Sequence, residues 1–206
     1  MRDEPIGAYL HRLAAREPAP GGGAAAALHA AQGAALVAMV ARYTSGPKYA
    51  QHAEQIERIT GRADALAERA LGLAAEDETA FGDVAAAYKL PRDTEADKAA
   101  RSAAIAEATV GATVPPAEVI AVSGEIVALA EALLPIGNPN VVTDIAAAAE
   151  AARAAATTSR VNIEINLAGV EDPDRRADLR AVAAEVDDIS AAVEKITARV
   201  REVISR

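Results

Sequence analysis

The segment from Pro18 to Met39, PAPGGGAAAALHAAQGAALVAM, constrains the fold of this chain more than any other stretch. Three consecutive glycines, Gly21, Gly22 and Gly23, precede a run of small residues that favour a helix. The pattern predicts a glycine-rich turn that leads into a helix, where free N–H groups and the positive end of the helix dipole attract an anion or a carbonyl oxygen. A helix start that only packs closely against its neighbours would account for the same residues.

The composition predicts one domain of closely packed helices. No stretch within residues 1–206 resembles a linker. Hydrophobic residues make up 51% of the chain but aromatic residues only 2%, so we expect small aliphatic side chains in the core. The formal net charge of −9 argues against a nucleic-acid partner, because binding phosphates requires a basic surface. The chain has no cysteine for disulfides or thiolate catalysis, and no recognisable signal peptide, which predicts a cytoplasmic protein.

The apolar run from Ala24 to Ala41 is long enough to raise the question of a membrane span. It consists mostly of alanine and glycine, contains His29 and Gln32, and lacks the aromatic belts of membrane spans. We therefore expect no membrane partner. A helix that is apolar on nearly every face is predicted to lie at the centre of a bundle or at a subunit interface, and we expect a homodimer through such small-residue helices.

Three segments carry apolar residues at steps of three and four, the spacing of packed helices. These apolar seams are Ile56, Ile59, Ala63, Leu66, Ala70 and Leu73; Val119, Val122, Ile126, Leu129 and Leu133; and Leu179, Val182, Val186, Ile189, Val193, Ile196, Val200 and Val203. Gly46-Pro47, Leu90-Pro91 and Gly137-Asn138-Pro139 are predicted breaks, and Pro115-Pro116 a helix start. The predicted fold is an all-α, single-domain bundle of about seven helices.

One segment does not fit a helical spacing. Val161, Ile163, Ile165 and Leu167 alternate with polar residues, as in a β-strand. A lone strand would leave its backbone unpaired, and the sequence offers no second strand. We therefore expect this segment to be the end of a long helix.

The first apolar seam leads to a carboxylate. Asp77 lies four residues after Leu73, so the periodicity places it on the packed face of the helix. Burial of a carboxyl group raises its pKa, which suits a general acid or base at neutral pH. The alternative is a structural aspartate that caps a kink or pairs with a buried arginine. Glu76 and Glu78 point to other faces and are predicted to be solvated.

Six short motifs follow one another along the chain: PAPGGGAAAAL (18–28), SGPKY (45–49), DETAF (77–81), YKLPR (88–92), NPNVVTD (138–144) and VNIEINL (161–167). In this order and spacing they resemble the cyclodeaminase/cyclohydrolase family, which includes the C-terminal domain of formiminotransferase-cyclodeaminase and the stand-alone methenyltetrahydrofolate cyclohydrolases. The resemblance covers nearly the whole chain. It implies the helical fold of that domain, and it implies that Asp77 is catalytic.

Asp144 follows Asn140 by four residues, in the predicted first turn of a helix, where the dipole favours a negative charge. Asn140 as N-cap and Asp144 as helix-start acid would explain the pair, and so would a substrate contact. The resemblance favours the substrate contact, because NxNxxSD is a motif of the family. Thr143 replaces the usual serine here and keeps the hydroxyl.

Lys48, Lys89 and Arg92 lie in or beside the predicted breaks and are expected to bind the anionic part of a ligand. Each could equally be an ordinary surface cation. The three histidines lack the spacing of metal ligands, so we expect no metal site.

The resemblance implies an enzyme of tetrahydrofolate one-carbon metabolism with no cofactor beyond its folate substrate. The preferred reaction is that of a methenyltetrahydrofolate cyclohydrolase, in which water adds to the carbon bridging N5 and N10 and the ring opens to 10-formyltetrahydrofolate. The first alternative is a formiminotetrahydrofolate cyclodeaminase, in which N10 attacks the formimino carbon and ammonia leaves. The second is a catalytically silent helical dimer that binds a folate or a partner. The absence of a fused formiminotransferase domain favours the cyclohydrolase.

Overall fold

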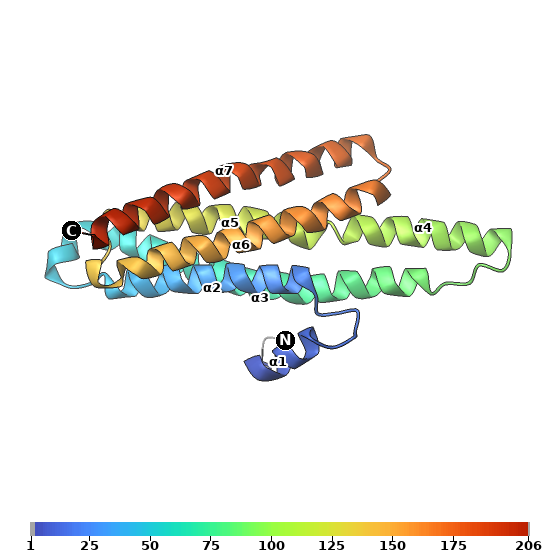
Figure 1. The fold of residues 1–206 in the computed structure, drawn as a ribbon, viewed down its shortest axis with the longest axis horizontal. Helices are drawn as coiled ribbons and strands as arrows, with labels where there is room; N and C mark the ends of the chain where they lie inside the picture. The colour runs from blue at the N-terminus through green and yellow to red at the C-terminus, as the bar shows by residue number, and fades with distance from the viewer. Residues whose placement is uncertain (1–2, 206) are drawn as a thin grey trace.

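The computed structural model describes residues 3–205 and folds them into seven α-helices joined by short loops (Figure 1). The α-helices are α1 (Ile6–Leu13), α2 (Gly22–Tyr43), α3 (Ala53–Tyr88), α4 (Glu95–Gly111), α5 (Val114–Leu133), α6 (Val142–Asn166) and α7 (Pro173–Ile204). Three 3₁₀ turns are η1 (Pro47–His52), η2 (Pro139–Val141) and η3 (Leu167–Gly169). No residue from 3 to 205 lies in a β-strand, and the predicted all-α bundle is confirmed.

Five long helices, α2, α3, α5, α6 and α7, run along one another and form the bundle (Figure 1). Helix α2 is central, because it packs against α3, α6 and α5. Helix α3 is longer than the rest, and its second half leaves the bundle to pair with α4 at one end of the molecule. The short helix α1 lies beside the bundle rather than within it.

Glycine and proline set the helix boundaries at the predicted breaks. Gly46 adopts a φ of 96°, a conformation that favours glycine, directly before Pro47 begins η1. The Leu90-Pro91 break separates α3 from α4. Helix α5 begins at Val114 with proline in its first turn, as the Pro115-Pro116 pair predicted.

The core consists of small aliphatic side chains, which lets the helices approach closely. A Cβ added to Gly33 of α2 would lie 2.9 Å from the Ala148 carbonyl oxygen of α6. All three apolar seams face this core: Leu73, Ile126 and Val193 are fully buried, and the remaining seam residues are buried or packed against the core. The predicted close packing of helices is therefore confirmed.

The apolar run that raised the membrane question forms helix α2. By length and composition this helix could cross a membrane, yet 61% of its most apolar 18-residue window is buried inside the bundle. Packing against α3, α5 and α6 therefore accounts for the apolar character of the run. Its outward face carries the exposed side chains of His29 and Gln32.

The segment with strand-like alternation is helical, as predicted. Helix α6 continues to Asn166, and the 3₁₀ turn η3 begins at Leu167. The alternation has a simple origin, because Ile163 is fully buried while Val161 and Ile165 are exposed on the opposite side of the helix.

Candidate active site at the start of helix α2

The start of α2 and the middle of α3 meet at Gly23 and Asp77. A Cβ added to Gly23 would overlap the carboxyl group of Asp77 and lie 2.6 Å from its Oδ2 atom. The neighbouring backbone N–H, that of Ala24, donates a hydrogen bond to the Asp77 side chain. The predicted carboxylate and the predicted glycine turn are therefore parts of one site. Only glycine at position 23 leaves room for this contact.

Opposing effects act on the Asp77 carboxyl group, which is half-buried. Desolvation raises its pKa above the ordinary value of 3.8, the Ala24 hydrogen bond lowers it, and the negative charge of Glu78 raises it; the net direction is upward. The hydrogen bond from the helix start stabilises the charged form, but desolvation outweighs it. Asp77 therefore holds its proton more tightly than a solvated aspartate does. A carboxyl group whose pKa lies above the ordinary value is suited to accept a proton and return it during a reaction.

The other two glycines are less crowded. The start of α2 has no side-chain cap, since Gly21 is the N-cap residue in extended conformation. A Cβ on Gly21 would meet nothing within 4 Å, and one on Gly22 would only touch Thr158 Cγ2 at 4.0 Å. The N–H groups of Gly22 and Gly23 therefore lack side-chain partners and can receive a ligand oxygen, whereas the N–H of Ala24 is bound to Asp77. The predicted close approach is at Gly23 rather than at all three glycines.

Helix α1 adds residues that the sequence did not single out. Arg12 pairs with Glu78 of α3 at 3.2 Å and with Glu4 at 3.0 Å, which holds α1 next to Asp77. The prediction that Glu78 is solvated was wrong, because this ion pair covers it. Glu76 pairs with Arg69 but stays exposed, as predicted. Tyr9, one turn before Arg12, is the buried residue of α1.

Helix α6 closes the other side of the α2 start. It runs antiparallel to α2, since Ala148 lies against Gly33 while Thr158 faces Gly22. Asn162 comes one turn after Thr158 and is therefore placed just beyond the first residue of α2. Its Nδ2 atom is buried and has no hydrogen-bond partner among the described residues. Asn162 is a further donor at this site; its motif, VNIEINL, was the signal that could have pointed to it.

Asn140 and Asp144 lie at the opposite end of α2 from Asp77. Asn138, just ahead of them, donates its backbone N–H to Thr44 and its side-chain amide to the carbonyl of Tyr43, the last residue of α2. With about 1.5 Å of rise per residue, the length of α2 puts some 30 Å between this end and the glycines. Asp144 lies in the first turn of α6, as predicted. Asn140 is not an N-cap, because Asn138 is the N-cap of η2 and Val141 that of α6.

The three predicted cations do not converge either. Lys48 lies in η1 before α3, whereas Lys89 and Arg92 follow the end of α3. All three side chains are exposed, and Lys48 contacts the ring of Tyr49 at 4.6 Å. At about 1.5 Å per residue the full length of α3, on the order of 50 Å, separates Lys48 from Lys89 and Arg92. One chain therefore cannot bring the three cations to a single ligand.

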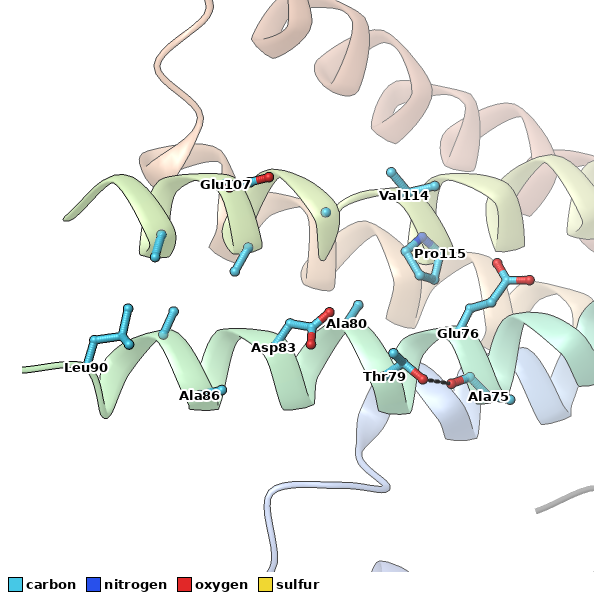
Figure 2. Close-up of a pocket in the computed structure, with 14 residues that line it drawn as sticks. Ala75, Glu76, Thr79, Ala80, Asp83, Ala86, Leu90, Glu107, Val114 and Pro115 are labelled. Carbon is cyan, nitrogen blue, oxygen red and sulfur yellow. Dashed lines mark hydrogen bonds between the residues drawn. The ribbon is translucent and has the colours of Figure 1, made fainter. Parts of the chain in front are cut away.

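A cleft of about 820 Å³ lies between the second half of α3 and α4 with the start of α5 (Figure 2). Alanines make up much of its wall, and Glu76, Asp83 and Glu107 provide its charges. Asp77 does not line it, and neither does any lysine or arginine. An anionic ligand is therefore disfavoured in this cleft by charge. Within residues 3–205 there is also no group of three or more histidine, aspartate or glutamate side chains that could hold a metal ion.

Comparison with known proteins gives consistent matches. A model of the formiminotransferase-cyclodeaminase family matches residues 5–185. The methenyltetrahydrofolate cyclohydrolase of Methylorubrum extorquens is 37% identical over 89% of this chain and 90% of that protein. The formimidoyltransferase-cyclodeaminase of Sus scrofa is 30% identical over 86% of this chain but only 33% of that protein, so this chain spans about a third of its length. The crystal structure of formiminotetrahydrofolate cyclodeaminase from Thermotoga maritima has a TM-score of 0.83 and 27% identity, and the match covers 99% of this chain and 97% of that chain.

Proposed function

This chain belongs to the formiminotransferase-cyclodeaminase family, and we propose that it is a methenyltetrahydrofolate cyclohydrolase that hydrolyses 5,10-methenyltetrahydrofolate to 10-formyltetrahydrofolate. The observation that carries the proposal is the Asp77 carboxyl group, half-buried against Gly23 at a helix start whose N-cap residue is a glycine. The similarity to a cyclohydrolase along nine-tenths of both chains supports the choice of reaction.

Asp77 performs the proton transfers of this reaction. The methenyl bridge carries a positive charge, which an adjacent carboxylate stabilises. A water molecule gives one proton to Asp77 as its oxygen bonds to the bridging carbon. Asp77 then returns that proton to N5 as the carbon–N5 bond breaks. The hydroxyl proton of the tetrahedral intermediate leaves to solvent as the formyl C=O forms, so the overall reaction consumes water and releases one proton.

The start of α2 orients the substrate. The N–H groups of Gly22 and Gly23 have no side-chain cap, so they are available to a carbonyl oxygen of the pterin ring. Asn162 supplies a further N–H donor on the α6 side. These donors lie on helices of the bundle core, which keeps their positions fixed relative to Asp77.

Formiminotetrahydrofolate cyclodeaminase activity is the second candidate, because N10 attack on the formimino carbon passes through the same kind of tetrahedral carbon. The Thermotoga protein specifically favours it, since that chain is similar to this one over 97% of its own length and is described as a cyclodeaminase. The Thermotoga cyclodeaminase chain therefore has almost no length left over for a fused formiminotransferase domain. The expectation that its absence favours the cyclohydrolase loses its force.

Self-association through α2 is part of the proposal. The outward face of this helix carries the exposed Ala35 and the half-buried side chains of Leu28, Leu36 and Met39. A second copy of the chain would remove this apolar strip from water. Ala31, by contrast, is 8% exposed and faces the core, so it is not available to a partner.

One experiment separates the candidates. Purified protein is offered methenyltetrahydrofolate and formiminotetrahydrofolate in turn, while loss of the methenyl chromophore and release of ammonia are followed. We expect rapid loss of the chromophore from the first substrate, and little ammonia from the second. Ammonia release without hydrolysis would identify a cyclodeaminase. Inactivity on both substrates with retained folate binding would identify the silent binding protein.

A further inference from the structure

The hydroxyl group of Tyr9 is buried without a hydrogen-bond partner among the described residues. The Tyr9 side chain is 6% exposed, although α1 lies outside the bundle and Tyr9 does not belong to the main hydrophobic core. Burial of a polar group without a partner is costly, and native proteins almost always satisfy such groups with protein, water or ligand. The Tyr9 hydroxyl therefore needs a partner that residues 3–205 do not supply.

Tyr9 lies on the helix that an ion pair holds beside Asp77. Tyr9 and Arg12 are three residues apart on α1 and share a face, and Arg12 binds Glu78, the residue next to Asp77. Four charged groups act on the Tyr9 hydroxyl: Glu78, Asp77 and Glu4 raise its pKa, and Arg12 lowers it. Desolvation is the largest effect and also raises the pKa, so the phenol stays protonated. Its O–H group is therefore available as a hydrogen-bond donor.

Asp77 thus supplies an acceptor and Tyr9 a donor, and the charge of Asp77 acts on the Tyr9 hydroxyl. The carboxylate of Asp77 accepts a hydrogen bond from the Ala24 N–H and can accept further ones. The O–H of Tyr9 has no acceptor among the described residues. A water molecule needs two to four polar partners to be held in a buried site. It can donate one hydrogen to Asp77 and accept a hydrogen bond from Tyr9. The second lone pair of its oxygen then remains free for attack on carbon.

We propose that Tyr9 positions the attacking water molecule of the hydrolytic reaction, by donating a hydrogen bond to the water that Asp77 deprotonates. This inference rests on the proposed cyclohydrolase function. Tyr9 itself transfers no proton: the water proton goes to Asp77, and the Tyr9 O–H remains intact and follows the oxygen onto the tetrahedral carbon. The ion pair between Arg12 and Glu78 keeps α1, and with it Tyr9, in place.

The test compares Tyr9→Phe with Tyr43→Phe. Tyr43 is 60% exposed at the far end of α2 and serves as the control for loss of a phenol hydroxyl. We expect Tyr9→Phe to lower kcat about a hundredfold, the size of effect that misplacement of a reacting group produces. KM should stay the same, because Tyr9 contacts water and not the folate. The melting temperature should not fall, because the ring that fills the space under α1 remains.

Two results would overturn the proposal. One is a Tyr9→Phe kcat within twofold of the unmodified enzyme, and the other is a loss of kcat that follows a loss of melting temperature, as a structural hydrogen bond would give. Spectroscopic titration adds a readout without activity: the Tyr9→Phe spectrum should lack a phenol whose pKa lies above the ordinary tyrosine value of 10.0. If the unmodified protein does not hydrolyse methenyltetrahydrofolate, the proposed function fails. If it does and Tyr9→Phe does so equally well, only the role of Tyr9 fails.

Discussion

Gly23 and Asp77 are matched across two helices: the carboxyl group of Asp77 occupies the space that a side chain at position 23 would take. The contact explains why glycine stands in the first turn of a helix that is otherwise rich in alanine. It also explains how a carboxylate is accommodated on a packed face, since the adjacent N–H of Ala24 compensates part of its desolvation. The glycine turn and the acid therefore form one functional unit.

Replacing Gly23 by alanine should displace Asp77. A Cβ at this position overlaps the carboxyl group, and a shift of about 1 Å in a reacting group can cost on the order of a hundredfold in rate. We expect Gly23→Ala to lower kcat by about that factor, measured by loss of the methenyl chromophore. Gly21→Ala is the control, because a Cβ there meets nothing within 4 Å. Equal activities of the two variants would show that Asp77 has room to move without consequence.

The Asp77→Asn variant tests the general acid/base role. The amide keeps the size of the side chain but cannot accept the proton from water. Loss of such a group typically costs ~100- to 10,000-fold in kcat. Affinity for a folate without the cationic methenyl bridge, measured by fluorescence titration, should change little. A variant with near-native turnover would mean that Asp77 is a structural carboxylate and that the proton acceptor lies elsewhere.

Asp77 also predicts how stability depends on pH. Its pKa is raised in the folded protein, so the native state binds this proton more tightly than the unfolded state does. Its contribution to stability is complete below the ordinary value of 3.8 and is lost as the pH rises through the folded-state pKa. Asp77→Asn should therefore unfold at higher urea concentration than the unmodified protein at neutral pH, and the difference should shrink in acid. A larger difference in acid would reverse the sign of the assigned shift.

The same pKa sets the acidic limb of the rate profile. Asp77 must be ionised to accept a proton, so kcat/KM should fall as the pH drops through its pKa, and the midpoint should lie above 3.8.

Periodicity predicted the parts of this molecule that local spacing determines. The step from Leu73 to Asp77 follows the helical repeat, so the sequence was enough to place the carboxylate on the packed face. The small-residue core followed from composition, and Gly33 against Ala148 shows the close helix crossing that it permits. The strand-like alternation around Ile163 was assigned to helix because no second strand was available.

The sequence motifs could not predict how far apart in space the candidate site residues lie along the long helices. Asn140 and Asp144 were predicted to contact the substrate, yet the antiparallel arrangement of α2 and α6 places them at the opposite end of the bundle from the glycines. Lys48 and Arg92 flank α3, whose length drives them apart. Tyr9 was missed because a single aromatic in a short amphipathic segment carries no periodic signal, and the contact that ties its helix to the bundle, the ion pair of Arg12 with Glu78, joins residues far apart in the sequence.

Self-association is tested by Ala35→Glu. Ala35 is exposed on the outward face of α2, so a charge there should not disturb the core of a single chain but should oppose burial of the apolar strip. We expect light scattering to show a dimer that the substitution dissociates, with an unchanged circular dichroism spectrum. Arg201→Glu is the control, because Arg201 is exposed near the end of α7. Gln32→Glu would not serve, because Gln32 lies on the same face of α2 as Ala35. A monomer at micromolar concentration in the unmodified protein would exclude the dimer.

The last prediction concerns the anionic glutamate tail of folates. Arg92 is exposed beyond the end of α3, some 15 residues from Asp77, which corresponds to about 20 Å along a helix. A tail that extends from a pterin ring at Asp77 could reach it, whereas Lys48 lies in the opposite direction. Arg92→Ala should raise KM a few-fold and leave kcat unchanged, because an exposed ion pair contributes only ~0–1 kcal/mol.

The dependence of this effect on tail length and salt decides its cause. The rise in KM should grow with the number of glutamates and shrink with added salt, since exposed charges are screened within about 8–10 Å. Arg58→Ala is the control, because Arg58 is exposed near the other end of α3 and pairs with Glu54 at 2.5 Å. If turnover collapses while affinity is unchanged, Arg92 acts at the reacting centre instead. If KM is the same for every tail length, Arg92 is an ordinary surface cation and the tail binds elsewhere.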